Sequence, residues 1–194
     1  DALRSAGVEE CETDTLTLCA AAAGVELSGF GARATVPLEP AMTAIDGFRL
    51  VLANLATTIT ANWQGTIDQT DPEFLHDLRI AVRRSRVVLA NAKQLLPAPI
   101  RNYIRAELAW LAELTSTPRD LDVYLLEWSK YTDPLGAEVA PLLEPVRDLL
   151  EQRRTDGHVA LESGLRSERA ATLMNSWQAW LTEPPVSDAP PPRA

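Results

Sequence analysis

The hydrophobic positions of this chain recur at helical spacing from Pro40 onward. The first apolar face has six members spaced three or four residues apart: Ile45, Phe48, Leu52, Leu55, Ile59 and Trp63. That spacing is typical of an amphipathic helix, and later segments repeat it. Valine, isoleucine and threonine form no alternating runs past residue 40. The pattern therefore predicts an all-α fold, an antiparallel helical bundle of about six helices around a four-helix-bundle core.

Prolines and capping residues set the expected ends of these helices. The expected helices lie at about residues 40–65, 71–97, 98–114, 117–128 and 166–181, with one more that starts between Pro134 and Pro145 and ends near Gly157 or Gly164. Asp71 fits the N-cap of the second helix, with Pro72 at its first position. Thr117 fits the N-cap of the fourth, with Pro118 at its first position and Asp120 three residues after the cap.

The residues before Pro40 differ in composition from the helical part. They include an acidic stretch (EECETD), a small apolar stretch (CAAAAG) and a turn-rich stretch (SGFGARATVP). Residues 1–39 are therefore interpreted as a linker or the remnant of an upstream domain, and residues 40–183 as one helical domain. Residues 184–194 are rich in proline and are expected to form a flexible tail or a linker.

The second helix carries a row of basic side chains along one face. Five residues fall within a stripe about 100° wide: His76, Arg79, Arg83, Arg86 and Lys93. Apolar residues adjoin this stripe on both sides, with Ile80 and Val87 on one of them. The pattern therefore predicts a partly enclosed basic groove along this helix.

Three more arginines are expected to extend the basic surface. Arg101 and Arg105 are four residues apart on the third helix and therefore share a face. Arg119 falls in the first turn of the fourth helix, where free backbone N–H groups favour anions. The alternative for Arg119 is an ion pair with Asp120 or Asp122, and the alternative for His76 is a purely structural role.

The charge is distributed unevenly along the chain. The whole chain carries −9 at pH 7, whereas residues 73–105 contain seven Lys or Arg and only two acids, a local balance of +5. A concentrated positive site on a negative body selects compact polyanions and repels indiscriminate ones. The competing interpretation is a basic face that is solvated or paired with Asp and Glu.

Few residues are candidates for catalysis or metal binding. The two histidines (His76 and His158) and the two cysteines (Cys11 and Cys19) are too few and too scattered for a metal site or a disulfide framework. No nucleophile–base pair or phosphate-cradling glycine loop stands out. No apolar run reaches membrane-spanning length. We therefore expect a non-enzymatic cytoplasmic protein with no metal, no cofactor and no membrane contact.

Two motifs occur in order, one on the second helix and one that runs from the third helix into the fourth. The first is His-x-x-Arg-x-x-x-Arg-Arg-x-Arg, at His76, Arg79, Arg83, Arg84 and Arg86; the second is Trp-Leu-Ala…Pro-Arg-Asp-Leu-Asp-Val, from Trp110 to Val123. Over about residues 40–182 the chain resembles the CHAD family, the conserved histidine α-helical domain. The resemblance implies a helical bundle that binds inorganic polyphosphate through a basic cavity, with some members associated with polyphosphate granules.

The resemblance covers the first half of the family's domain. The full domain has two similar four-helix halves, and no second His-x-x-Arg-x-x-x-Arg helix occurs here. A second half is therefore expected from a longer chain or from a second copy, as in a homodimer. Family members often follow a triphosphate-tunnel (CYTH) domain, and residues 10–14 (ECETD) are similar to the start of its Glu-x-Glu-x-Lys motif. Asp14 replaces the lysine, and too few residues precede Pro40 for that barrel, so triphosphatase activity is not expected.

The favoured function is thus non-catalytic binding of inorganic polyphosphate or a similar polyanion. Eight residues are expected to carry it: His76, Arg79, Arg83, Arg86, Lys93, Arg101, Arg105 and Arg119. The alternative is a protein-interaction module whose basic helix docks an acidic partner or a second copy. Nucleic acid is not favoured, because single-strand binders set aromatic residues among basic ones, and only Phe74 and Tyr103 lie near the stripe.

Overall fold

The computed structural model describes residues 22, 36–93, 95–136 and 138–182 of the chain. From residue 36 onward the described residues form helices and turns and contain no strand, which confirms the all-α fold. Six helices in this part have eleven residues or more: α3 (Ala44–Ile67), α4 (Pro72–Asn91), α5 (Ala98–Leu114), α6 (Ser116–Leu126), α8 (Glu144–Leu165) and α9 (Glu168–Thr182). Three short elements join α6 to α8: α7 (Trp128–Thr132), η1 (Asp133–Leu135) and η2 (Ala140–Leu143).

Two predicted regions fall outside this description. The segment interpreted as a linker or domain remnant, residues 1–39, is described only at residue 22 and from residue 36 onward. The proline-rich tail at residues 184–194, both cysteines and the ECETD motif all lie outside the described residues.

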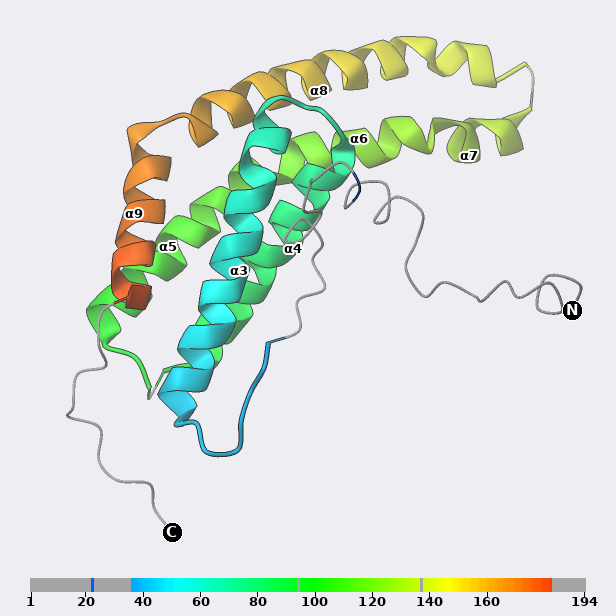
Figure 1. The fold of residues 1–194 in the computed structure, drawn as a ribbon. Coiled ribbons are helices and arrows are strands. Elements are labelled where there is room, and N and C mark those ends of the chain that lie inside the picture. Colours follow the sequence, from blue (N-terminus) through cyan, green and yellow to red (C-terminus); the bar gives the residue numbers. More distant parts are fainter. Residues whose placement is uncertain (1–21, 23–35, 94, 137, 183–194) are drawn as a thin grey trace, which may run out of the picture.

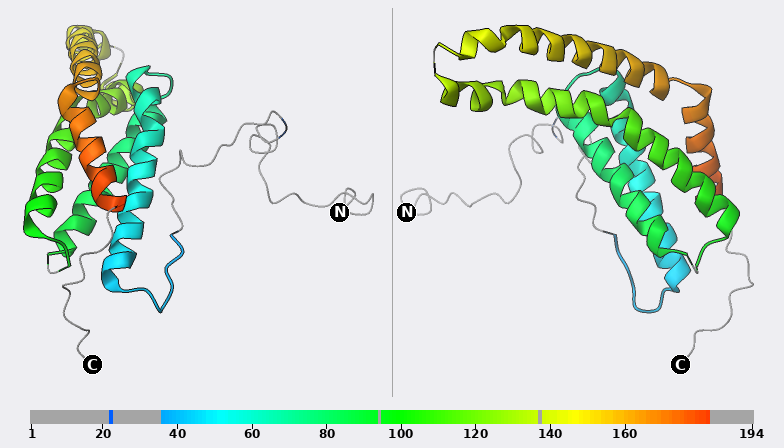
Figure 2. Two further views of the ribbon diagram at one scale, coloured as in Figure 1. Left: turned by 60° about the vertical axis from the view of Figure 1, so that its left-hand side comes forward. Right: turned by 180° about the vertical axis from the view of Figure 1, so that it is seen from behind.

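Four helices pack side by side to form the body of the molecule. Both α3 and α5 contact α4 and α9, so these four helices close a ring around one core (Figures 1 and 2). The core contains large side chains that are less than 2% exposed, drawn from all four helices: Leu52, Ile59, Leu78, Leu108, Leu173 and Trp177. Burial of each such side chain contributes about 1.5–3 kcal/mol. The predicted four-helix-bundle core is therefore confirmed.

The start of α4 forms as predicted. The Asp71 carboxylate accepts a hydrogen bond from the Glu73 backbone N–H at 2.8 Å, and Pro72 is the first residue of the helix. This cap satisfies a backbone donor that the helix itself leaves without a partner.

The end of α4 differs from the prediction. The helix ends at Asn91 and not at Pro97, because the backbone N–H groups of Leu95 and Leu96 both bond to the Ala92 carbonyl. Leu96 is then buried in the core. The prediction that Lys93 continues the basic face of the helix is therefore wrong, since Lys93 lies beyond the helix end.

Helix α5 passes into α6 with only Thr115 between them. Thr115 has helical backbone angles (φ −86°, ψ −10°), and its hydroxyl donates to the Leu111 carbonyl at 2.9 Å. Pro118 has no N–H and so interrupts the backbone hydrogen bonds of a continuous helix. The predicted N-cap at Thr117 is wrong, because α6 begins at Ser116 without a side-chain cap.

Helices α6, α7 and α8 form an arm that projects from the bundle (Figure 1). The buried Asp122 carboxylate on α6 accepts hydrogen bonds from two α8 residues, Arg154 Nε at 2.5 Å and His158 Nε2 at 3.1 Å. His158 is thus a buried residue that joins α8 to α6. None of the described helices combines the length and the apolar character that crossing a bilayer requires.

Candidate functional site

An open groove runs between α4 and α5. Three of the predicted arginines line it, Arg83 and Arg86 from α4 and Arg105 from α5. The remaining lining residues are mostly small: Val87, Ala90, Asn102, Ala106 and Ala109. Small side chains at facing positions leave space between the two helices, and the groove has a volume of about 590 Å³. Two helices therefore form a groove that three of the eight predicted residues line.

The three guanidinium groups of this groove are exposed and lack acidic partners in the described part of the chain. None of them forms an ion pair there, whereas arginines elsewhere on the surface do, such as Arg147 and Arg166. Like charges held close together repel one another. An anion that enters the groove would relieve this repulsion, so the arrangement favours a ligand with several negative charges.

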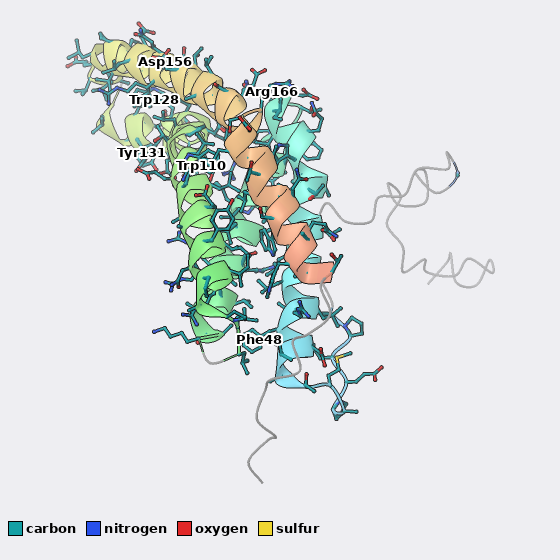
Figure 3. All side chains as sticks on the ribbon, turned by 90° about the vertical axis from the view of Figure 1, so that its left-hand side faces the viewer. Phe48, Trp110, Trp128, Tyr131, Asp156 and Arg166 are labelled. Atoms are coloured by element: carbon teal, nitrogen blue, oxygen red, sulfur yellow. The ribbon has the colours of Figure 1, made fainter. Side chains whose placement is uncertain are left out.

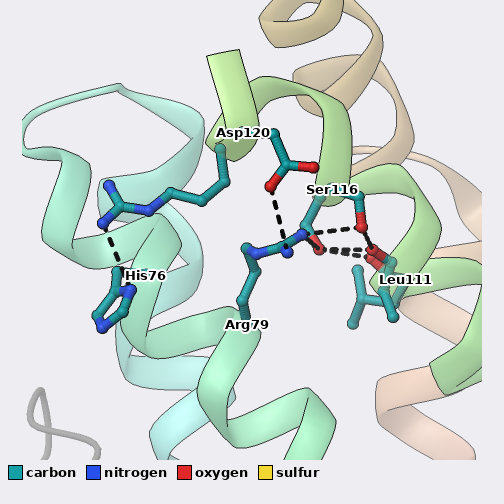
Figure 4. Close-up of polar contacts among 8 residues, drawn as sticks. His76, Arg79, Leu111, Ser116 and Asp120 are labelled. Carbon is teal, nitrogen blue, oxygen red and sulfur yellow. Dashed lines mark hydrogen bonds and ion pairs between the residues drawn. The ribbon is translucent and has the colours of Figure 1, made fainter. Parts of the chain in front are cut away.

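A second basic cluster lies at the start of α6 (Figure 4). It consists of His76 and Arg79 from α4 and Arg119 from α6. Arg119 Nη2 lies 3.4 Å from His76 Nδ1, and Arg79 Nη1 donates to Ser116 Oγ at 3.0 Å. Because arginine has no acceptor, the His76 Nδ1 atom accepts, and its Nε2 carries the hydrogen when the ring is neutral.

Two exposed carboxylates flank this second cluster. Asp120 lies 3.9 Å from Arg79, and Glu73 lies 3.9 Å from Arg119. Asp120, predicted as a cap residue, thus acts as an ion-pair partner. Burial lowers the pKa of Arg79 from its ordinary value, an effect that Asp120 opposes and Arg119 reinforces. The cluster at the start of α6 is therefore partly neutralised, in contrast to the groove between α4 and α5.

The two remaining predicted residues are Lys93, in the turn after α4, and Arg101, near the start of α5. Arg101 Nη1 donates to the backbone carbonyl of Lys93 at 2.5 Å, which ties the start of α5 to the turn after α4. Neither residue lines the groove between α4 and α5. Sequence reasoning missed Asn102, which does line it; its position three residues before Arg105 on α5 is the signal that it shares that face.

Arg119 forms an ion pair, but with a different acid from the two that the sequence suggested. Arg119 contacts Glu73 and not Asp120 or Asp122. Asp122 is instead committed to α8: burial raises its pKa, but the hydrogen bonds from His158 and Arg154 outweigh this effect and hold the pKa below its ordinary value. Among the described residues, no group of three or more His, Cys, Asp and Glu side chains is arranged to hold a metal ion.

Fold and groove together define a class of protein, an all-α helical bundle with exposed arginines along a groove. These arginines have no acidic partner among the described residues. The model of the CHAD domain matches residues 50–194, and the chain belongs to the CHAD domain family. The crystal structure of the CHAD domain from the plant Ricinus communis superposes with a TM-score of 0.64 at 27% sequence identity. The match covers 80% of this chain and 51% of that one, so this chain spans about half the length of that structure. No curated protein matches the chain.

Proposed function

We propose that this chain is a non-catalytic module that binds inorganic polyphosphate in the groove between α4 and α5. The observation that carries the proposal is the convergence of Arg83, Arg86 and Arg105 on one open groove without a carboxylate partner among the described residues. Membership of the CHAD family supports it, because the resemblance in the arginine motif implies a polyphosphate ligand. On this proposal the protein acts in the cytoplasm, where polyphosphate granules are its expected location.

The chemistry of the groove suits a linear polyanion. A guanidinium group forms two parallel hydrogen bonds to phosphate oxygens, and these are stronger than neutral ones because the charges reinforce them. Residues three or four apart on a helix place their side chains about 5–6 Å apart, so Arg83 and Arg86 reach neighbouring phosphates. Arg105 then contacts the polymer from the opposite wall.

The cluster of His76, Arg79 and Arg119 extends the path of the polymer towards α6. A phosphate there would accept hydrogen bonds from the two guanidinium groups and from the Nε2–H of His76. Because Asp120 and Glu73 already lie near the two arginines, this cluster is proposed to contribute less affinity than the groove.

The test is calorimetric titration of long-chain inorganic polyphosphate into the parent and into the double variant Arg83→Glu/Arg86→Glu. A matched control is Arg147→Glu/Arg166→Glu, which makes the same change in net charge on exposed α8 and post-α8 positions. The groove variant is expected to lose at least roughly 100-fold in affinity, as two charge-assisted contacts of about 1.5–3 kcal/mol each disappear. The control is expected to keep most of its affinity, and equal losses in both variants would contradict the groove as the site.

A second function has one observation in its favour. Because the chain spans about half of the Ricinus communis structure, the basic face of α4 is also a candidate binding surface for an acidic partner or a second copy. Light scattering with and without polyphosphate separates the two functions. A dimer that Arg83→Glu abolishes, and that polyphosphate leaves intact, would favour the docking function.

A further inference from the structure

Most of the exposed large hydrophobic side chains lie on or near the arm. The described residues include thirteen such side chains, and nine of them lie between Tyr124 and Val159. Figure 3 looks along the arm, with Trp128, Tyr131 and Asp156 on it and Trp110 at its base. Trp128 is only half-buried. Helices that expose an apolar face in this way typically pack it against another element.

Exposed residues of η2 and α8 form a regular row, apolar in its first half, which we call the α8 seam. Its members are spaced alternately four and three residues apart: Leu142, Val146, Leu149, Arg153, Asp156 and Ala160. This is the spacing of a seam between two packed helices. Leu142 is 73% exposed, Val146 46% and Leu149 47%.

The charged residues beside these apolar positions face elsewhere. Arg147 pairs with Glu144 and Glu151, which lie three residues before it and four after it, along another side of α8. The first half of the seam is therefore apolar, with its neighbouring charges already matched within the helix.

The second half of the seam borders a hollow at the base of the arm. Arg153, Asp156 and Ala160 form one wall of it, and Trp110 and Pro118 contribute to the opposite side. The hollow has a volume of about 630 Å³. The seam thus has apolar side chains at one end and borders the hollow at the other, where Arg153 and Asp156 belong to the seam and Glu113 lies on the opposite wall.

We propose that this arm is the docking surface for a second copy of the chain, with the two α8 helices antiparallel about a two-fold axis. A two-fold contact brings residue i of one copy to residue j of the other, and j to i. In the register where Arg153 of each copy faces Asp156 of the other, Leu149 of each copy enters the hollow of the other beside Ala160. The seam is complementary to itself in shape and in charge.

The charges of the seam favour a second copy as the occupant. The opposite charges of Arg153 and Asp156, three residues apart, are matched by the same pair in reversed order, which an identical antiparallel helix supplies. At 1.5 Å per residue, the 22 residues of α8 make a helix about 33 Å long, so the apolar and charged parts of the seam lie on one continuous surface.

The experiment is sedimentation equilibrium of the whole chain at micromolar concentrations. The parent is expected to be a dimer, and Leu149→Glu is expected to raise the dimer dissociation constant by at least roughly tenfold, since a charge would enter the hollow. Leu126→Glu is the matched control, because Leu126 is 82% exposed on α6 and lies off the seam. It is expected to leave the dimer intact.

A charge exchange supplies the second arm of the test. Arg153→Glu is expected to weaken the dimer, and Arg153→Glu/Asp156→Arg is expected to restore it, because the reciprocal pairing returns. A parent that stays monomeric, a Leu149→Glu variant that dimerises as the parent does, or a double variant without rescue would overturn the proposal. Circular dichroism checks that each variant folds, and polyphosphate titration of Leu149→Glu shows separately whether the groove between α4 and α5 still binds.

Discussion

At the scale of single residues, the proposed binding of polyphosphate in the groove between α4 and α5 depends on the geometry of the guanidinium groups as well as on their charge. Arg83 and Arg86 stand on one helix and Arg105 on the next, so the ligand is approached from two walls. Arginine presents a rigid planar fork to phosphate, whereas lysine offers a single rotating ammonium group. The proposed site is therefore sensitive to substitutions that keep the charge.

We predict that Arg105→Lys weakens polyphosphate binding by roughly three- to tenfold, a part of the about 1.5–3 kcal/mol that a charge-assisted contact contributes. Arg105→Ala should weaken it further, because the charge is also lost. Isothermal titration of both variants against the parent measures the difference. Equal affinities for Arg105→Lys and the parent would mean that Arg105 contributes only its charge.

A second residue-scale prediction concerns acid stability. The pKa of Asp122 lies below its ordinary value in the folded chain, so its contribution is present at neutral pH and is lost as pH falls through the folded pKa. Asp122→Asn is expected to lower the free energy of unfolding by about 1–3 kcal/mol at neutral pH. It should also flatten the loss of stability below about pH 4. Urea unfolding across this pH range measures both effects, and parallel curves for variant and parent would contradict the assignment.

Helical phase explains which site residues were predictable. Arg83 and Arg86 share a face because of their spacing on α4, and that face is readable from the sequence. The partners of Asp122 were not readable, because Arg154 and His158 are 32 and 36 residues away and meet it only through packing. The Glu73 contact of Arg119 likewise depends on how α4 and α6 cross, which local spacing does not specify.

At the scale of elements, the cap of α4 matters most because it sets where the basic helix starts. Asp71 is exposed and makes one hydrogen bond to the Glu73 N–H, so its role is local. Asp71→Ala is expected to lower the free energy of unfolding by about 1 kcal/mol. Thermal or urea unfolding measures this loss, with Asp71→Asn as a control that keeps a capping side chain. An unchanged midpoint would contradict the role of the cap.

Element ends were less predictable than element cores. The start of α4 followed from Asp71 and Pro72, whose capping chemistry is local. The end of α4 depends on burial of Leu96, a tertiary contact that overrides the helical pattern through residue 97. The same holds at Thr115, where α5 and α6 join with helical backbone angles and without the cap that Thr117 suggested.

At the scale of the whole molecule, the fold separates two surfaces. The bundle of α3, α4, α5 and α9 presents the basic groove, and the arm of α6, α7 and α8 presents the α8 seam. The sequence predicted the bundle, since each apolar face requires a partner helix. The projecting arm was not predictable, because periodicity marks which residues are apolar and does not tell which of them stay exposed.

The most direct test of the account is the salt dependence of polyphosphate binding. For three phosphate contacts, by analogy with single-stranded nucleic acid, the slope of log K against log salt is about −2, so affinity should fall roughly 20-fold between about 50 mM and about 200 mM salt. Arg83→Glu/Arg86→Glu should bind weakly, with a slope reduced to about −0.7, because Arg105 alone remains of the three contacts. Binding by the parent that ignores salt, or a double variant with the parent's affinity and slope, would contradict polyphosphate binding through the groove between α4 and α5.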